Sequence, residues 1–325
     1  MGGDRAPEEV VHGALAAART GTQITLVGDA HRLDPLVRSL ADSDGRAVDV
    51  DIVNATQVIE MGEDPTSALR DKKDASISVA ARLVERGEAG GFVSAGSTGA
   101  ALAAAAFIIG RVEGVSRPAI ATLMPNNKVV LDAGANLSCR PQHLAEFAVM
   151  GTALARTHFG IETPAVGLLN IGEEAGKGRD LEKEAHGLLA AMTGINFVGN
   201  IEGRDIATDA ADVIVTDGYT GNVFLKTAEG VARMVQGIIL DAISDPQYAD
   251  AVATLMPALA GIRQQLDPEA TGGAYLLGIE GMVVIAHGAS SRVAVENAIA
   301  LAVEGAEYDV PGQIARGLTL ERAIV

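Results

Sequence analysis

The stretch FVSAGSTGAALAAA (residues 92–105) joins a short apolar run to an alanine-rich segment through a turn of glycine, serine and threonine. The apolar run predicts a buried strand, and the alanine-rich segment predicts a helix. A strand, a tight turn and a helix form the repeating unit of α/β proteins that are built on a parallel sheet. This stretch therefore indicates an α/β fold.

The same unit recurs along the chain. Most of the other apolar runs that end in glycine or polar turns are followed by a helix-like pattern. They are QITLVGD (23–29), VDIVNAT (50–56), KVVLDAGAN (128–136), AVGLLNIGEE (165–174), NFVGNIEG (196–203), DVIVTDGYTGN (212–222) and MVVIAHG (282–288). Such alternation is typical of a mainly parallel sheet covered on both faces. Because no linker-like tract divides the chain, the sequence predicts one α/β domain over residues 1–325, with two lobes as an alternative.

Composition excludes several classes of protein. The formal charge of the 325 residues is −17, which argues against general nucleic-acid binding. The single Cys139 excludes an intrachain disulfide framework and fits a reducing compartment. The N-terminal residues lack the apolar core of a signal peptide, and the longest apolar run (100–109) is too short to cross a bilayer. We therefore expect a cytoplasmic protein.

The segment 240–272 breaks the alternation of strands and helices, and its sequence predicts a helical hairpin insertion. Apolar residues recur there at helical spacing with few charges, Pro257 interrupts the run, and Asp267-Pro268 ends it. The apolar residues are Val252, Leu255, Met256, Leu259 and Ile262. From the residues alone, packing on the sheet or on a partner subunit is favoured over an exposed tip for a membrane or an acyl chain.

The turn after the strand at residue 92 is the first candidate binding site, since ligands of parallel sheets bind beyond the carboxyl ends of the strands. Gly96 and Gly99 allow the backbone to approach a ligand, and Ser97 and Thr98 add hydroxyl donors at a helix N-terminus. Phosphate or a carboxylate fits such a turn. The alternative is that Ser97 only caps the helix. The turn matches neither a Walker A loop nor the dinucleotide-binding fingerprint.

Further polar residues follow other strands. Lys177 lies between two glycines in GEEAGKGRDL (172–181), and Asn222 and Lys226 are four residues apart, so they share a helix face that suits an oxyanion or a phosphate. The other candidates are Lys73, Asp132, Asn136, Asp217, Gly221, His287 and Ser290. No metal-ligand spacing and no strong covalent nucleophile is visible. The pattern favours catalysis by positioning, with bound phosphate as the nucleophile.

Taken together, these motifs resemble the PlsX family of bacterial phosphate acyltransferases. The matching pieces run in order along almost the whole chain: MGGDRAP (1–7), EDPTSALRDKKDAS (63–76), VSAGSTGA (93–100), GVSRPAIA (114–121), LDAGAN (131–136), HLAEFAVMG (143–151), GLLNIGEEAGKG (167–178), NFVGNIEGRDI (196–206) and DGYTGNVFLKTAEG (217–230), followed by LLGIEG and AHGAS near the C-terminus. Ser97 stands where the family commonly has asparagine. The family also has a strand ahead of MGGD, which the printed sequence does not contain.

The resemblance implies transfer of a long-chain fatty acyl group from acyl carrier protein to inorganic phosphate. It implies a three-layer α/β/α fold like that of isocitrate and isopropylmalate dehydrogenases, a homodimer, and peripheral membrane contact through the hairpin. This reverses the preference stated above, so that Leu255, Met256, Leu259 and Ile262 become residues of an exposed membrane or acyl contact.

The resemblance also places the family's glycine-rich turn at Gly96–Gly99 and its motif lysine and asparagine at Lys177 and Asn222. The roles that follow are our hypothesis. Phosphate is expected at Gly96–Gly99, near Gly2, Gly3 and Asp4 of the MGGD motif. Lys177 orients the phosphate, while Asn222 and Lys226 stabilise the oxyanion. No metal or cofactor is required. Docking of the acidic carrier protein needs a local basic patch, for which the candidates are Arg179, Lys183, Arg204 and Arg233.

Two other functions remain open. A phosphotransacetylase that uses acetyl-CoA would share the fold and the phosphate chemistry. A membrane-docked scaffold that binds acyl carrier protein would need no catalytic group.

Overall fold

The computed structural model describes residues 1–43, 50–266 and 268–322 of the chain. Its core is an eight-stranded sheet of order β3-β10-β9-β4-β5-β8-β6-β7, and β1 and β2 form a separate parallel pair. The strands are β1 (Thr25–Gly28), β2 (Asp51–Asn54), β3 (Gly91–Ser94), β4 (Ala119–Met124), β5 (Lys128–Leu131), β6 (Ala165–Asn170), β7 (Asn196–Glu202), β8 (Val213–Val215), β9 (Ala274–Leu277) and β10 (Met282–Ile285).

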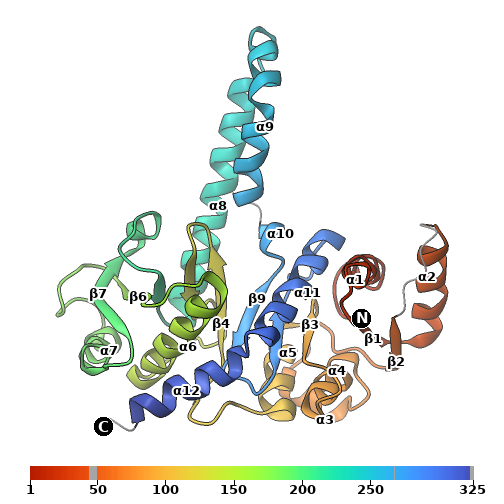
Figure 1. Ribbon diagram of the computed structural model, residues 1–325, viewed down its shortest axis with the longest axis horizontal. Helices are drawn as coiled ribbons and strands as arrows, with labels where there is room; N and C mark the ends of the chain where they lie inside the picture. Colours follow the sequence, from red (N-terminus) through yellow and green to blue (C-terminus); the bar gives the residue numbers. More distant parts are fainter. Residues whose placement is uncertain (44–49, 267, 323–325) are drawn as a thin grey trace.

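Helices cover the sheet on both sides, which gives three layers (Figure 1). They are α1 (Glu8–Arg19), α2 (Ala30–Ser43), α3 (Pro65–Asp71), α4 (Ser76–Glu85), α5 (Thr98–Ala104), α6 (Pro141–Phe159), α7 (Asp180–Ala191), α8 (Gly218–Ile243), α9 (Ala249–Leu266), α10 (Pro268–Thr271), α11 (Arg292–Glu307) and α12 (Val310–Arg322). Three shorter helical turns are η1 (Ala105–Ile109), η2 (Gly203–Ala207) and η3 (Pro246–Tyr248). The expected α/β/α fold class is confirmed.

Two strands near the middle of the sheet change its direction. β9 pairs antiparallel with both β10 and β4, and β4 pairs antiparallel with β5. β3 is parallel to β10, while β5, β8, β6 and β7 are parallel to one another. As a result, β3 and β10 run opposite to β5, β8, β6 and β7. The sequence predicted the parallel strands but neither β4 nor β9.

The core follows from the alternation of side chains along the strands. On one face, Leu131 and Val129 pack with Phe147 of α6 and Leu301 of α11. On the opposite face, Phe92 and Val283 pack with the alanines of α4 and α5. Because alanine is small, α5 packs closely on the sheet, and a sequence with few aromatic residues still fills its core.

The hairpin consists of α8 and α9 and rises above the body of the molecule (Figure 1). Its first helix begins at Gly218, well before the expected boundary at residue 240, and α9 continues through Pro257. The turn of the hairpin therefore lies between Ile243 and Ala249 rather than at the proline.

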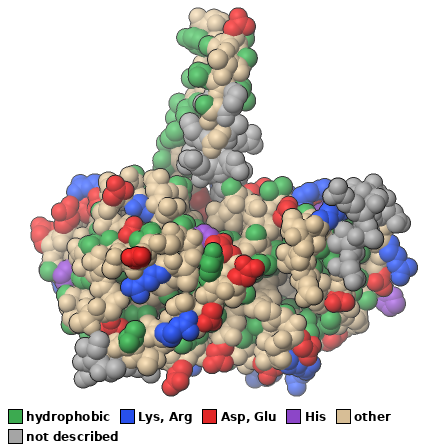
Figure 2. All heavy atoms as spheres, in the orientation of Figure 1, with side chains coloured by type: hydrophobic (Ala, Val, Ile, Leu, Met, Phe, Trp, Pro, Cys, Tyr) green, Lys and Arg blue, Asp and Glu red, His purple; other side chains and the backbone are tan. Residues whose placement is uncertain are grey.

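Large apolar side chains are exposed along the hairpin, as Figure 2 shows. Leu255 and Met256 are 56% and 49% exposed, whereas the side chains of Leu259 and Ile262 lie outside the described residues. The exposed residues of α8 are Tyr219, Val223, Val231, Met234, Val235, Ile238, Ile239 and Leu240. Within the described part of the chain, no helix combines the length and apolarity that crossing a membrane would require.

A cavity of about 570 Å³ separates the β1–β2 pair from the edge strand β3. Leu26 of β1, Phe92 of β3 and Val295 of α11 line it, together with Met1. Side-chain packing joins β1 and β2 to the rest of the fold. Leu26 of β1 lies in one apolar cluster with Val11 of α1 and Val295 of α11, and α1 packs along α11.

Candidate active site

The first group of predicted residues gathers where the chain start meets the turns after β3 and β10. The backbone N–H of Asp4 donates to the Gly288 carbonyl at 2.8 Å. A methyl group on Gly3 would lie 3.0 Å from the Ala95 carbonyl oxygen, and one on Gly2 would lie 3.3 Å from Gly96 Cα. Only glycine permits this close approach without displacing the neighbouring backbone. We call residues 2–4, 95–99 and 287–290 the amino-terminal cluster.

Ser97 in this cluster is a helix cap. Its Oγ accepts a hydrogen bond from Ala100 N at 3.3 Å, and the residue is 6% exposed. This is the capping alternative considered from the sequence, and it leaves Thr98 as the exposed hydroxyl of the turn. Because Ser97 takes the Ala100 N–H, only the N–H groups of Thr98 and Gly99 in the first turn of α5 can be offered to a ligand.

The second group, which we call the central cluster, is built around Asp132 at the end of β5. Asp132 is fully buried, and its Oδ1 accepts from the backbone N–H groups of Ile120, Gly134 and Ala135 at 2.9 to 3.1 Å. Its Oδ2 accepts from N and Nδ2 of Asn136 at 2.7 and 2.8 Å. Burial raises the pKa of Asp132, and these hydrogen bonds oppose the shift. Asp132 therefore holds the turn together rather than offering a free carboxylate.

The start of α8 completes the central cluster. Gly218 N donates to the Asn136 carbonyl at 2.8 Å, and a methyl group on Gly221 would overlap the Asp132 carbonyl oxygen. The Asn222 side chain lies beside Gly134, since a methyl group there would be 3.5 Å from Asn222 Oδ1. The structure thus brings together four of the candidate residues, Asp132, Asn136, Gly221 and Asn222, while their roles stay a prediction.

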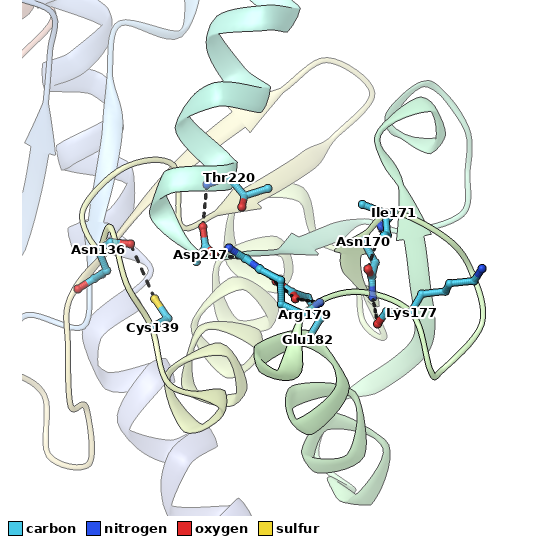
Figure 3. Close-up of polar contacts among 9 residues, drawn as sticks. All are labelled: Asn136, Cys139, Asn170, Ile171, Lys177, Arg179, Glu182, Asp217 and Thr220. Carbon is cyan, nitrogen blue, oxygen red and sulfur yellow. Dashed lines mark hydrogen bonds and ion pairs between the residues drawn. The ribbon is translucent and has the colours of Figure 1, made fainter.

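Arg179 links this cluster to the loop that carries Lys177. Its guanidinium donates to Asp217 and to Glu182, whose hydrogen bonds raise the pKa of Arg179 further. Asp217, 3% exposed, also accepts from Thr220 N at 2.7 Å and so caps α8. Figure 3 shows Arg179 between the two carboxylates, while Lys177 extends away from them. This link was not predicted from the sequence. Its one local signal is Glu182 at the third position of α7, where a glutamate commonly accepts from the N-cap backbone N–H.

Three predicted cations lie at the surface. Lys177 Nζ is 3.8 Å from Glu174, and its side chain is half exposed. Lys226 Nζ pairs with Glu229 at 3.0 Å. Lys73 is exposed, whereas its neighbour Lys72 donates to the Val58 carbonyl and to Glu63, so Lys72 is the anchored lysine of that motif.

His287 and Ser290 follow β10 and belong to the amino-terminal cluster. His287 is exposed and its Nδ1 accepts from Ala289 N at 3.2 Å, while the Ser290 N–H donates to the His287 carbonyl at 2.9 Å. The strands that precede the two clusters run in opposite directions, because β4 and β9 reverse the sheet between them.

Cys139 is a poor candidate nucleophile. Burial raises the pKa of its thiol to about 11, and the nearby Asp132 carboxylate adds to the shift. Since the thiolate is the reactive species, this environment keeps the sulfur unreactive at neutral pH. Cys139 is therefore not proposed as a nucleophile, and non-covalent catalysis stays a prediction.

Comparisons with solved structures identify the class of fold. A phosphotransacetylase from Staphylococcus aureus superposes with a TM-score of 0.55 at 18% identity, over 91% of this chain and 99% of that one. A 4-hydroxythreonine-4-phosphate dehydrogenase from Klebsiella pneumoniae superposes with a TM-score of 0.51 at 14% identity, over 92% and 94% of the two chains. The chain therefore has the α/β/α fold that phosphotransacylases share with this group of dehydrogenases.

Sequence comparisons identify the family. The family model described as "Fatty acid synthesis protein" matches residues 1–313. A phosphate acyltransferase from Pelotomaculum thermopropionicum is 50% identical over 94% of this chain and 90% of its own length. Another from Heliobacterium modesticaldum is 45% identical over 97% of both chains. The chain belongs to this family of enzymes, the PlsX phosphate acyltransferases.

Proposed function

We propose that this acyltransferase takes a long-chain fatty acyl group from acyl carrier protein and transfers it to inorganic phosphate, giving acyl phosphate for phospholipid synthesis. Acyl transfer to phosphate follows from the family, and the resemblance supports the carrier-bound donor. The observation that favours a long chain is the hairpin. The same helix, α8, carries Asn222 at its start and a series of exposed apolar side chains further along.

The proposed roles of the residues are those expected from the sequence. Phosphate binds at Gly96–Gly99, where the N-terminus of α5 supplies backbone donors and a positive dipole end. Gly2 and Gly3 pack against that turn, and Asp4 holds the chain start to Gly288 beside it. Lys177 offsets the phosphate charge, because its side chain is long, half exposed and flanked by glycines. Asn222 and Lys226 stabilise the oxyanion from one face of α8.

The chemistry needs no covalent enzyme intermediate. A phosphate oxygen attacks the thioester carbonyl carbon, a new C–O bond forms, and the C–S bond breaks. The carrier thiol leaves, taking up a proton for which His287 is the candidate donor. Positioning of the two substrates supplies much of the rate enhancement in such a reaction.

The first experiment measures phosphate-dependent thiol release from palmitoyl-(acyl carrier protein), with acetyl-CoA in a parallel reaction. We expect turnover with the long-chain thioester alone. Turnover with acetyl-CoA would favour a phosphotransacetylase. If the folded protein released thiol from neither substrate, the scaffold function would be favoured instead.

We further propose that the hairpin makes the peripheral membrane contact and that the protein acts as a homodimer. The double variant Leu255→Ser/Met256→Ser removes two exposed apolar side chains, so it should weaken vesicle binding at least about tenfold while leaving thiol release intact. Vesicle flotation checks the first effect. Equal flotation of variant and parent would contradict the membrane role. Light scattering measures the oligomeric state of both.

A further inference from the structure

Arg179 makes two ion pairs that the proposed mechanism does not use. One guanidinium bridges two carboxylates that belong to different helices: Glu182 in the first turn of α7 and Asp217 at the cap of α8. The two carboxylates are separated by 35 residues of chain and are both buried, being 7% and 3% exposed. Arg179 is thus the ionic connection between the β6–α7 loop and the start of α8.

Each carboxylate also completes a helix N-terminus. Glu182 accepts from Arg179 N at 2.7 Å, which closes the start of α7, and Asp217 accepts from Thr220 N at 2.7 Å, which closes the start of α8. Helix N-termini favour negative charge, so both carboxylates are stabilised where they lie. Without the guanidinium, two buried carboxylates would face each other without their shared counter-charge, which is costly.

The position of this bridge matters for the proposed reaction. Lys177 precedes Arg179 by two residues, and Asn222 follows Asp217 by five. The Lys177 side chain does little to fix its own loop, because its ammonium lies 3.8 Å from the Glu174 carboxylate and both side chains are exposed to solvent. The backbone is instead held by Asn170, whose Nδ2 donates to the Lys177 carbonyl at 3.1 Å, and by Arg179.

We propose that Arg179 is a positioning residue that fixes the Lys177 loop relative to Asn222 on α8. This inference rests on the proposed function for its effect on turnover. It replaces the carrier-docking role that the sequence allowed for Arg179, since its guanidinium is held by two carboxylates. Asp217 accordingly acts through Arg179 and the α8 cap rather than by binding substrate.

The test compares Arg179→Gln with Arg316→Gln. Arg316 is a matched control, because it is 58% exposed against 57% for Arg179 and pairs with a single exposed carboxylate, that of Asp309. We expect Arg179→Gln to lower kcat about ten- to a hundredfold with KM for both substrates within about threefold. Arg179→Lys keeps the positive charge but lacks the planar guanidinium that bonds both carboxylates at once. Its kcat should therefore lie between those of Arg179→Gln and the parent.

Two further measurements separate positioning from docking. In Arg179→Gln/Asp217→Asn, kcat should fall no further than in the worse single variant, because both changes break the same connection. Amide exchange at Thr220 should accelerate about tenfold or more in Arg179→Gln but not in Arg316→Gln. A salt-dependent rise in KM for the carrier, with kcat and Thr220 exchange unchanged, would overturn the proposal.

The exchange measurement does not depend on the reaction. If the parent protein released no thiol, the proposed function would fail, yet unchanged exchange at Thr220 in Arg179→Gln would still refute the bridge. Should Arg179→Gln not fold, the same two readouts apply to Arg179→Lys. Faster exchange in that variant without a loss of kcat would show that the bridge orders α8 but does not position the reaction.

Discussion

Gly221→Ala is expected to destabilise the fold by about 3 kcal/mol or more and to lower turnover about a hundredfold. A methyl group at this position would overlap the Asp132 carbonyl oxygen and would also lie 3.0 Å from Thr216 Cγ2. Neither neighbour can move freely, because Asp132 and Thr216 are both buried and the Asp132 carboxylate accepts five hydrogen bonds. The start of α8 must therefore shift, and Asn222 shifts with it.

The matched control is Gly230→Ala on the same helix. A methyl group on Gly230 meets nothing within 4 Å, so this change should leave turnover intact and stabilise α8 by about 0.5 to 1 kcal/mol. Denaturant unfolding and the thiol-release assay measure both effects. If Gly221→Ala behaved like Gly230→Ala, the close packing of α8 on the Asp132 turn would be unnecessary for the site.

The fold was largely predictable because parallel strands in this chain are short apolar runs that end in glycine-rich turns. KVVL and VIV were recognised in this way, and they form β5 and β8. β4 and β9 were not predicted because their connections differ from those of the parallel strands. β4 leads into β5 through a tight hairpin, and β9 follows the long helical insertion and leads into β10. Neither is followed by a helix, so the strand–turn–helix pattern could not reveal them. Yet these two strands reverse the sheet.

The candidate site was predictable in its turns but not in its connections. Single turns such as LDAGAN carry their own local signals, since a small-residue turn after a strand is visible in the sequence. The bridge from Arg179 to Asp217 joins residues 38 positions apart and leaves no periodic trace. Likewise, the sequence could not tell that Lys72 rather than Lys73 is anchored, because both occupy one charged run and only the fold decides which one reaches Glu63.

Lys177→Ala is expected to reduce turnover about a thousandfold while leaving the melting temperature unchanged. The side chain is half exposed, and its ion pair with Glu174 is long at 3.8 Å, so it contributes little to stability. The predicted loss therefore arises from the reaction alone: without the ammonium, phosphate must approach the thioester in a field set by a chain of net charge −17.

The kinetic pattern identifies what Lys177 does. If it only binds phosphate, Lys177→Ala should raise KM for phosphate and retain kcat at saturation; if it acts in the transition state, kcat should fall as well. Lys177→Arg keeps the charge and should restore part of the activity in either case. Arg316→Ala removes a surface charge elsewhere and serves as the control. Retention of full activity by Lys177→Ala would remove the residue from the mechanism and leave Asn222, on the helix that Arg179 holds in place, as the principal polar group acting on the thioester.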